Sequence, residues 1–130
     1  MKILITVAVL VSFLSWLPAQ TSVRVASASK RSFNSTPTNS ILVANIQSRL
    51  VSVVGYNAGP DQWVFIMNTN AVQGANAKPT MPPIKVLSHT QFSVDYTGGK
   101  TMNTGIFIGN STTPITLTNG ANDFFYEVNF

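Results

Sequence analysis

Side chains that could carry out acid–base catalysis are few in this sequence. His89 is the only histidine, and it lies between two short apolar runs. A histidine base needs an orienting carboxylate or a partner nucleophile. The sequence contains no Gly-x-Ser-x-Gly elbow that would supply the nucleophile. We therefore expect His89 to be an exposed loop residue.

The four carboxylates offer one pair for glycoside hydrolysis, Asp95 and Glu127. Such a pair must stand about 5–10 Å apart across a cleft. Both residues fall on the polar faces of predicted strands, so they could share one face of a sheet. The presence of both carboxylates is explained more simply if they face solvent or pair with lysine across strands. We predict no catalytic residues and no enzymatic activity.

Three loops rich in Asn, Asp and Gly could contribute oxygen ligands to calcium: Asn57–Gln62, Asp95–Gly99 and Asn119–Asp123. Calcium binds six to eight oxygens, several of them from carboxylates, and each loop has one carboxylate. Turn formation explains the same residues, because Asn, Asp and Gly tolerate left-handed backbone conformations. The absence of cysteine excludes zinc–thiolate and iron–sulfur sites. We predict no metal site and no cofactor.

Aromatic side chains are the remaining candidates for a binding site. Trp63 with Tyr56, Tyr96 and Tyr126 could form a platform on which a sugar stacks. Strand alternation puts Tyr96 and Tyr126 on the same faces as phenylalanines, which favours the core for both. The predicted ligand or assembly surface is therefore Tyr56, Asn57 and Trp63.

Two triplets, Asn34-Ser35-Thr36 and Asn110-Ser111-Thr112, match the N-glycosylation signal. The signal is common by chance in a chain rich in Asn and Thr. It matters only in a eukaryotic secretory host.

The composition indicates one domain with a neutral, hydrogen-bonding surface. Apolar residues make up 45% of the 130 residues and charged residues 9%, against about 25% charged residues in an ordinary globular domain. The net charge is +4, and without the first 28 residues it falls to +2. Nucleic-acid binding needs clustered basic residues, and these are scattered. We predict no nucleic-acid partner.

The N-terminal segment has the pattern of a secretory signal. Lys2 precedes an uncharged apolar run, Ile3–Leu17, which is shorter than a membrane-spanning helix. Cleavage after Ala19 or Ala28 fits this pattern. We predict a signal peptide or leader helix in residues 1–28, a flexible Ser/Thr-rich arm in 29–40, and a β-sandwich in 41–130, exported and without membrane contact after the leader is removed.

The stretch Arg49–Asn68 organises the rest of the sequence. Two apolar, β-branched and aromatic runs, Leu50–Tyr56 and Trp63–Met67, flank the turn-forming segment Asn57–Gln62. This arrangement predicts a β-hairpin. Both runs are apolar on both faces, which predicts central strands that are covered on each side.

Further short β runs, separated by turn residues, surround this stretch. They are Ile41–Ile46, Ile84–Leu87, Gln91–Tyr96, Gly105–Gly109, Ile115–Thr118 and Asp123–Phe130. The segment Thr97–Lys100 reads as a turn, and Thr69–Pro83 as a long loop. The last run carries Phe124, Tyr126 and Val128 on one face, so we expect it to lie inside a sheet. The predicted fold is an all-β antiparallel sandwich, jelly-roll or immunoglobulin-like, of about seven or eight strands.

Three pieces of this layout carry a resemblance to known proteins: Gly55-Tyr56-Asn57, Phe92–Tyr96, and Thr104-Gly105-Ile106 followed by Asn110–Pro114. Together they resemble small uncharacterised β domains of bacteriophage structural proteins and environmental bacterial proteins. The resemblance covers roughly residues 48–130. It implies an all-β fold and a surface or assembly role, and no catalytic residues.

These observations predict a non-enzymatic protein that is secreted or otherwise extracytoplasmic, or alternatively part of a virion. We expect a structural, assembly or surface-binding role, with self-association or another surface or virion protein as the partner. The alternative is a carbohydrate-binding or adhesion module, with a glycan as the partner. The neutral surface, rich in Asn and Thr, is compatible with either role.

Overall fold

The structure, a computed structural model, describes residues 30–130, which form eight β-strands and no helix. The strands are β1 (Arg31–Phe33), β2 (Ser40–Ala44), β3 (Ser48–Asn57), β4 (Gln62–Met67), β5 (Ile84–Val86), β6 (Gln91–Met102), β7 (Ile106–Ser111) and β8 (Phe124–Asn129). The predicted leader helix, both cleavage points and the start of the arm lie outside the described residues.

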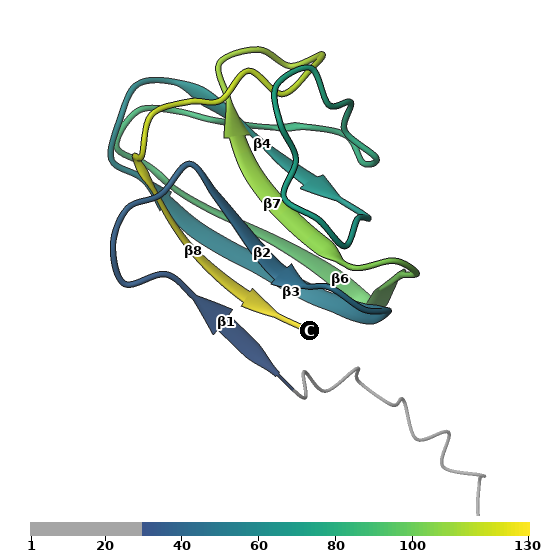
Figure 1. Cartoon of the computed structure of the whole chain (residues 1–130). Helices are drawn as coiled ribbons and strands as arrows, with labels where there is room; N and C mark the ends of the chain where they lie inside the picture. The colour runs from purple at the N-terminus through teal and green to yellow at the C-terminus, as the bar shows by residue number, and fades with distance from the viewer. Residues whose placement is uncertain (1–29) are drawn as a thin grey trace, which may run out of the picture.

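The strands form two antiparallel sheets of four strands each, which confirms the predicted all-β, two-layer fold (Figure 1). Sheet A has the order β1-β8-β3-β6, and sheet B the order β2-β7-β4-β5. The ladders are nested: β1 pairs with β8, β2 with β7, β3 with β6, and β4 with β5. The first strand therefore lies beside the last, and the end of the chain lies next to β1.

The predicted hairpin across residues 57–62 is wrong. Strand β3 pairs with β6 and β8 in sheet A, whereas β4 pairs with β5 and β7 in sheet B. The connecting residues pass from one sheet to the other, and the amide of Ala58 donates to the carbonyl of Asp123. Turn residues predicted the bend correctly, but they do not determine which strands pair across it.

The predicted turn at Thr97–Lys100 is also wrong, because β6 continues through it as one strand. Gly98 and Gly99 both have φ of 77°, and the register between β3 and β6 shifts opposite them, between Leu50 and Ser52. Left-handed glycines of this kind form a bulge within a ladder as readily as a turn. The Arg49 guanidinium donates to the Gly98 carbonyl and holds the irregular segment against β3.

Two further segments differ from the prediction. Ile115–Thr118 forms no strand, and near it only an isolated bridge joins Ser111 to Asn119. Arg31–Phe33, within the segment expected to be an arm, forms β1 and pairs with β8, so this segment is part of the sandwich. A three-residue strand has too short a pattern to be recognised from alternation alone.

The main core fills the space between the sheets. Its fully buried members include Leu50 and Val53 from β3, Ile66 from β4, and Phe124 and Val128 from β8. The inward stripe predicted for the last strand is therefore confirmed. Phe124 stacks on Tyr126 with ring centroids 5.6 Å apart, and Phe92 from β6 meets both rings edge-on.

A second core lies on the outer face of sheet B. It consists of Phe65, Met67, Phe107 and Leu117, with Trp63 and Ala77 packed against them. Two loops cover it, the β4–β5 connection with Ala77 and the β7–β8 connection with Leu117. The Leu117 amide donates to the Ala77 carbonyl and joins the two loops. Both faces of β4 are thus covered, as predicted. The same prediction is wrong for β3, because Val54 on its outer face is 38% exposed.

Removing Tyr126–Phe130 would delete most of β8, leaving β1 without its partner strand and β3 paired with β6 alone. We expect the shortened chain to show no cooperative unfolding transition in circular dichroism.

Replacing the buried ring in Phe124→Ala should lower the free energy of unfolding by about 3–5 kcal/mol. The control Phe125→Ser, on the outer face of the same strand, should lose about 1 kcal/mol or less. A shortened chain that still unfolds cooperatively would contradict the central role of β8.

Candidate functional site

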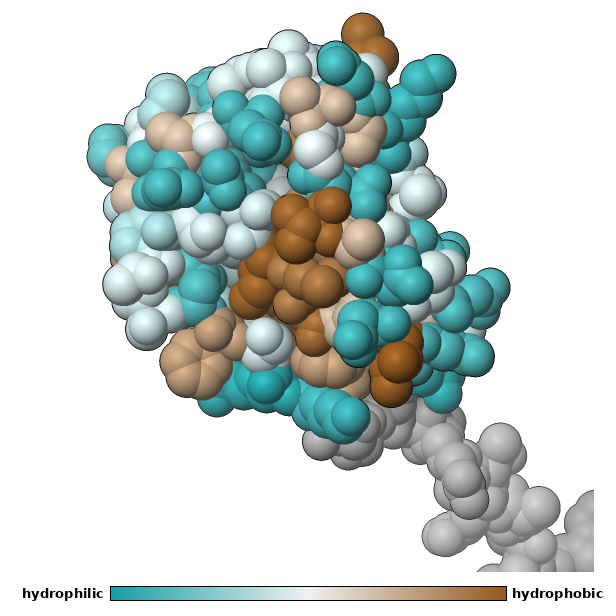
Figure 2. Space-filling view, viewed as in Figure 1, coloured by the Kyte–Doolittle hydropathy of each residue, from teal (hydrophilic) through white to brown (hydrophobic). Residues whose placement is uncertain are grey.

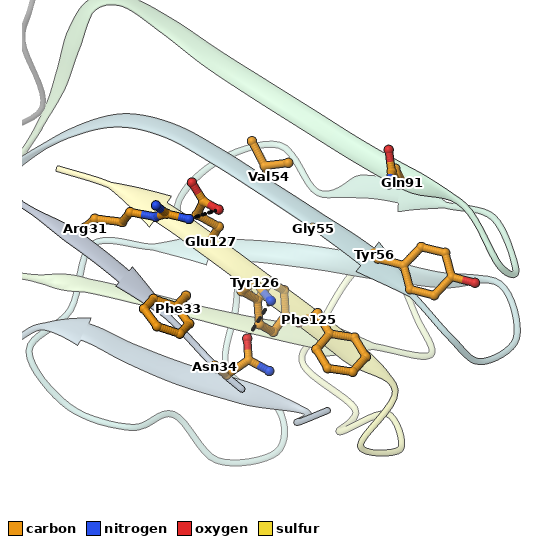
Figure 3. Close-up of a pocket in the computed structure, with 10 residues that line it drawn as sticks. All are labelled: Arg31, Phe33, Asn34, Val54, Gly55, Tyr56, Gln91, Phe125, Tyr126 and Glu127. Carbon is orange, nitrogen blue, oxygen red and sulfur yellow. Dashed lines mark hydrogen bonds and ion pairs between the residues drawn. The ribbon is translucent and has the colours of Figure 1, made fainter. Parts of the chain in front are cut away.

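A groove on the open outer face of sheet A is the strongest candidate for a functional site (Figure 3). Its volume is about 300 Å³, at the small end of the range for ligand sites. Strands β1, β3, β6 and β8 all contribute to it. The lining residues are Arg31, Phe33, Asn34, Val54, Gly55, Tyr56, Gln91, Phe125, Tyr126 and Glu127.

The register of sheet A arranges the outward side chains in rows across the strands. One row runs from Gln91 through Tyr56 to Phe125. The next row runs from Ser93 through Val54 to Glu127, and β1 extends it with Phe33. Alternation makes every second residue of each strand face outward. The two rows together form an apolar and aromatic floor with polar ends.

The charged residues of the groove neutralise each other. Arg31 Nη2 lies 2.6 Å from Glu127 Oε2, and the Arg31 guanidinium carbon lies 5.7 Å from the centre of the Phe33 ring. An exposed ion pair of this kind stabilises the fold by at most about 1 kcal/mol. Its main consequence is local, because it leaves the groove without net charge. It also places the Arg31 cation beside the ring of Phe33, a residue that is 65% exposed.

Asn34 anchors the strand that forms one wall of the groove. Its side-chain oxygen Oδ1 accepts from the Tyr126 backbone amide, and its side-chain nitrogen Nδ2 donates to the Phe124 backbone carbonyl at 3.0 Å. Figure 3 shows the first of these bonds as a dashed line. The amide that matches the glycosylation signal at Asn34 is therefore engaged in tying β1 to β8.

The three residues predicted as a ligand or assembly surface lie in three different settings. Tyr56 lies in the groove. Asn57 is fully buried, and its amide bonds to Gly59, Pro60 and Leu87. Trp63 packs on the second core, on the outer side of the other sheet. The structure does not bring Tyr56 and Trp63 together.

The candidate acid–base residues are also separated. His89 is exposed in a turn, with φ of 54°. Asp95 pairs with Ser52, and Glu127 pairs with Val54, so both carboxylates face outward from sheet A with β3 between them. Two interstrand spacings put their Cα atoms at least about 9–10 Å apart.

A buried cluster of amides joins two of the loops that were considered for calcium. Gln62 accepts from Asn110 and donates to Asp123 at 3.1 Å, and Asn110 also donates to the Ala121 carbonyl at 3.0 Å. Asn110 and Gln62 are 0% and 1% exposed. The cluster ties the β3–β4 connection to the β7–β8 connection. The glycosylation triplet at Asn110 is thus inaccessible in the folded domain.

Most of the oxygens in this cluster already accept hydrogen bonds from protein groups. Asn110 Oδ1 is buried and has no partner in the described part of the chain. Nowhere in residues 30–130 do three or more His, Asp or Glu side chains gather into a metal-binding group. The third loop considered for calcium, Asp95–Gly99, is part of β6.

A second apolar surface lies over β2, one of the two edge strands of sheet B (Figure 2). Leu42 is 36% exposed there, and one side of β2 pairs with no described strand. Edge strands of this kind can add a further strand.

The groove could not have been located from the sequence. Phe33, Phe125 and Gln91 were not singled out, because Phe125 and Gln91 look like ordinary outward residues and Phe33 lay in a segment without alternation. The one sequence feature that points to the groove is that Tyr56 and Val54 share one face of the same strand.

Comparisons with protein-family models, with curated proteins and with solved structures found no match to this chain. Among residues 30–130, no helix reaches the length and apolar character needed to cross a bilayer.

Tyr126→Phe should leave the protein as stable as the wild type at pH 7, or more stable by up to about 1 kcal/mol. The Tyr126 hydroxyl is buried without a hydrogen-bond partner among residues 30–130, and an unpaired buried hydroxyl is costly. Burial raises the pKa of the Tyr126 phenol well above its ordinary value. The unfolded chain, with a pKa of about 10, would ionise first, so wild-type stability should fall as the pH rises above 10.

Urea unfolding at pH 7 and pH 10.5 tests this expectation. The variant should lose less stability than the wild type between the two values, and Tyr56→Phe is the control for removing a hydroxyl. A loss of more than about 1 kcal/mol at pH 7 would show that the Tyr126 hydroxyl has a partner.

Asn110→Asp should destabilise the protein in a pH-dependent way. Burial and the nearby Asp123 both raise the pKa of the new carboxyl above the value of about 3.9 in the unfolded chain. The electrostatic penalty is therefore absent where the carboxyl is protonated in both states, and it grows as the pH rises above about 4. Loss of the amide donors to Gln62 and Ala121 adds a cost at every pH. We expect a deficit of about 3 kcal/mol at pH 7 and a smaller one at pH 3.5.

Urea unfolding of the variant and the wild type at both pH values measures this deficit. Asn119→Asp, in the exposed part of the same connection, should change stability by less than about 0.5 kcal/mol. Equal deficits for Asn110→Asp at both pH values would refute the electrostatic explanation.

Proposed function

We propose that this chain is a non-enzymatic, extracytoplasmic β-sandwich that acts by binding, as a structural or surface-binding protein. The observation that carries the proposal is the groove on sheet A. Sheet B is covered on its outer face by two loops, whereas sheet A leaves Phe33, Val54, Tyr56 and Phe125 around an open hollow. Exposed apolar surface that is concave and rimmed by polar residues is typical of interaction sites.

The nested pairing of the strands supports a jelly roll over an immunoglobulin-like sandwich. In a jelly roll one long hairpin is wrapped so that the first strand meets the last and the second meets the next-to-last, as β1–β8 and β2–β7 do here. The immunoglobulin arrangement instead keeps its first strand in a sheet with the second, fourth and fifth. Jelly rolls occur in capsid and lectin domains, an analogy of fold that is weaker than the groove itself.

Three features support a binding role over catalysis. His89 stands on an exposed turn, Asp95 and Glu127 are divided by β3, and Glu127 is paired with Arg31. A catalytic base, by contrast, needs an orienting partner within hydrogen-bond reach. None of the groove residues has the pairing of nucleophile and base that acyl or glycosyl transfer requires.

The location and the partner belong to the same proposal. Export rests on the apolar run Ile3–Leu17 behind Lys2. The virion alternative rests on the resemblance of residues 48–130 to bacteriophage structural domains. Self-association, or contact with another surface or virion protein, would use the groove or the β2 edge. The carbohydrate-binding or adhesion alternative is favoured by the aromatic residues in the groove.

Co-sedimentation of the full chain with the surface material of the producing culture, cell envelopes or virions, tests the binding role. We expect the wild type to pellet with this material and Val54→Lys to remain in the supernatant, because it places a charge in the centre of the apolar floor. Ile115→Lys, at a side chain 75% exposed on a loop, should pellet like the wild type. A wild type that stays wholly in the supernatant would contradict the proposal.

A further inference from the structure

We infer that the groove on sheet A binds a neutral saccharide, with a sugar ring lying on Tyr56 and Phe125 and its hydroxyls bonded to the groove's polar side chains. This inference rests on the proposed binding function and adds the chemical class of the ligand. It depends on three properties of the groove: its aromatic floor, its uncommitted polar groups, and its lack of net charge.

The floor presents aromatic surface where a flat ligand can lie. Tyr56 and Phe125 are register partners on adjacent strands, and both face the groove (Figure 3). Val54 and Phe33 continue the apolar surface, with exposed fractions of 38% and 65%. The C–H face of a sugar ring is apolar, whereas its edge carries hydroxyls. It therefore fits an aromatic floor with polar groups at the sides.

The polar groups at the sides are uncommitted. Within residues 30–130, the Tyr56 hydroxyl and the Gln91 amide make no side-chain hydrogen bond, and Glu127 uses only Oε2 in its pair with Arg31. A hydroxyl and an amide each supply both a donor and an acceptor, and a carboxylate oxygen supplies an acceptor. Sugar hydroxyls, which both donate and accept, can satisfy all three.

This inventory disfavours the other ligand that aromatic grooves bind, a proline-rich peptide. A polyproline segment offers carbonyl acceptors but few donors. Glu127 Oε1 and the oxygens of Gln91 and Tyr56 would then be covered without a donor, at the cost of unpaired acceptors. A sugar avoids that cost.

The charge balance disfavours ionic ligands. Among residues 30–130, Arg31 and Glu127 are the only charged residues that line the groove, and they pair with each other. A phosphate, sulfate or acidic sugar that reached Arg31 would also face the Glu127 carboxylate, which repels it as a like charge. A neutral sugar leaves the pair intact.

Titrations followed by ¹H–¹⁵N NMR on the full chain test the inference. The probes are three neutral oligosaccharides, cellohexaose, maltohexaose and chitohexaose, with oligogalacturonate as the acidic sugar and a proline hexamer as the peptide. We expect at least one neutral sugar to shift the signals of Val54, Tyr56, Gln91 and Phe125, and the acidic sugar and the peptide to shift none.

Three variants separate the contributions to binding. Tyr56→Ala should weaken sugar binding at least tenfold, whereas Tyr56→Phe, which keeps the ring, should weaken it severalfold. Trp63→Phe, an aromatic change on the outer side of sheet B, should bind as the wild type does. The thermal unfolding midpoint of each variant shows whether it is folded, and Tyr56→Phe remains informative if Tyr56→Ala is not.

Two results would overturn the inference. If no neutral sugar shifts the groove signals, or if Tyr56→Ala and Tyr56→Phe both bind sugar as the wild type does, the groove is not a saccharide site. Groove shifts with the proline hexamer, or with rising protein concentration alone, would assign the groove to a peptide or to a second copy of the chain. Either result would leave the proposed binding function standing, because co-sedimentation tests that function separately.

Discussion

The insertion of β8 between β1 and β3 is the interaction on which the rest of the structure depends. The last strand of the chain pairs with the first on one side and with the third on the other. Its inward stripe, Phe124, Tyr126 and Val128, supplies the aromatic centre of the main core. Sheet A is therefore incomplete until the whole chain is present. Contacts between such distant segments also make folding slow relative to a fold of local hairpins.

The two sheets treat their outer faces differently, and this difference creates the site. Sheet B lies under two long connections, which bury Phe65, Met67 and Phe107 in a second core. These connections lie over sheet B and leave the outer face of sheet A open, so Val54 and Phe33 on that face remain exposed. An uncovered apolar face costs solubility unless it is used. This cost is the physical reason to assign the groove a binding role.

The sequence was a good guide wherever one strand could be considered alone. Alternation correctly placed Phe92, Phe124 and Tyr126 toward the core, and the apolar faces of β4 correctly predicted cover on both sides. It failed where the answer depended on a distant segment. A turn at residues 57–62 looks the same whether it joins neighbours in one sheet or crosses to the other. Gly98 and Gly99 likewise fit a turn or a bulge, and only the partner strand decides between them.

The groove escaped prediction for the same reason. Its members come from four strands, and pairing order alone makes Gln91, Tyr56 and Phe125 neighbours. In the sequence, Val54 looks like any core valine, because nothing local shows that no loop covers it. The wall formed by β1 depends on Asn34, whose amide bonds to the backbone on either side of Phe125. Since β1 holds both Arg31 and Phe33, the docking that completes the sheet also completes the groove. A site built in this way, on paired strands and not on a loop, is preorganised, so a ligand of the kind proposed would lose little binding free energy to ordering the protein.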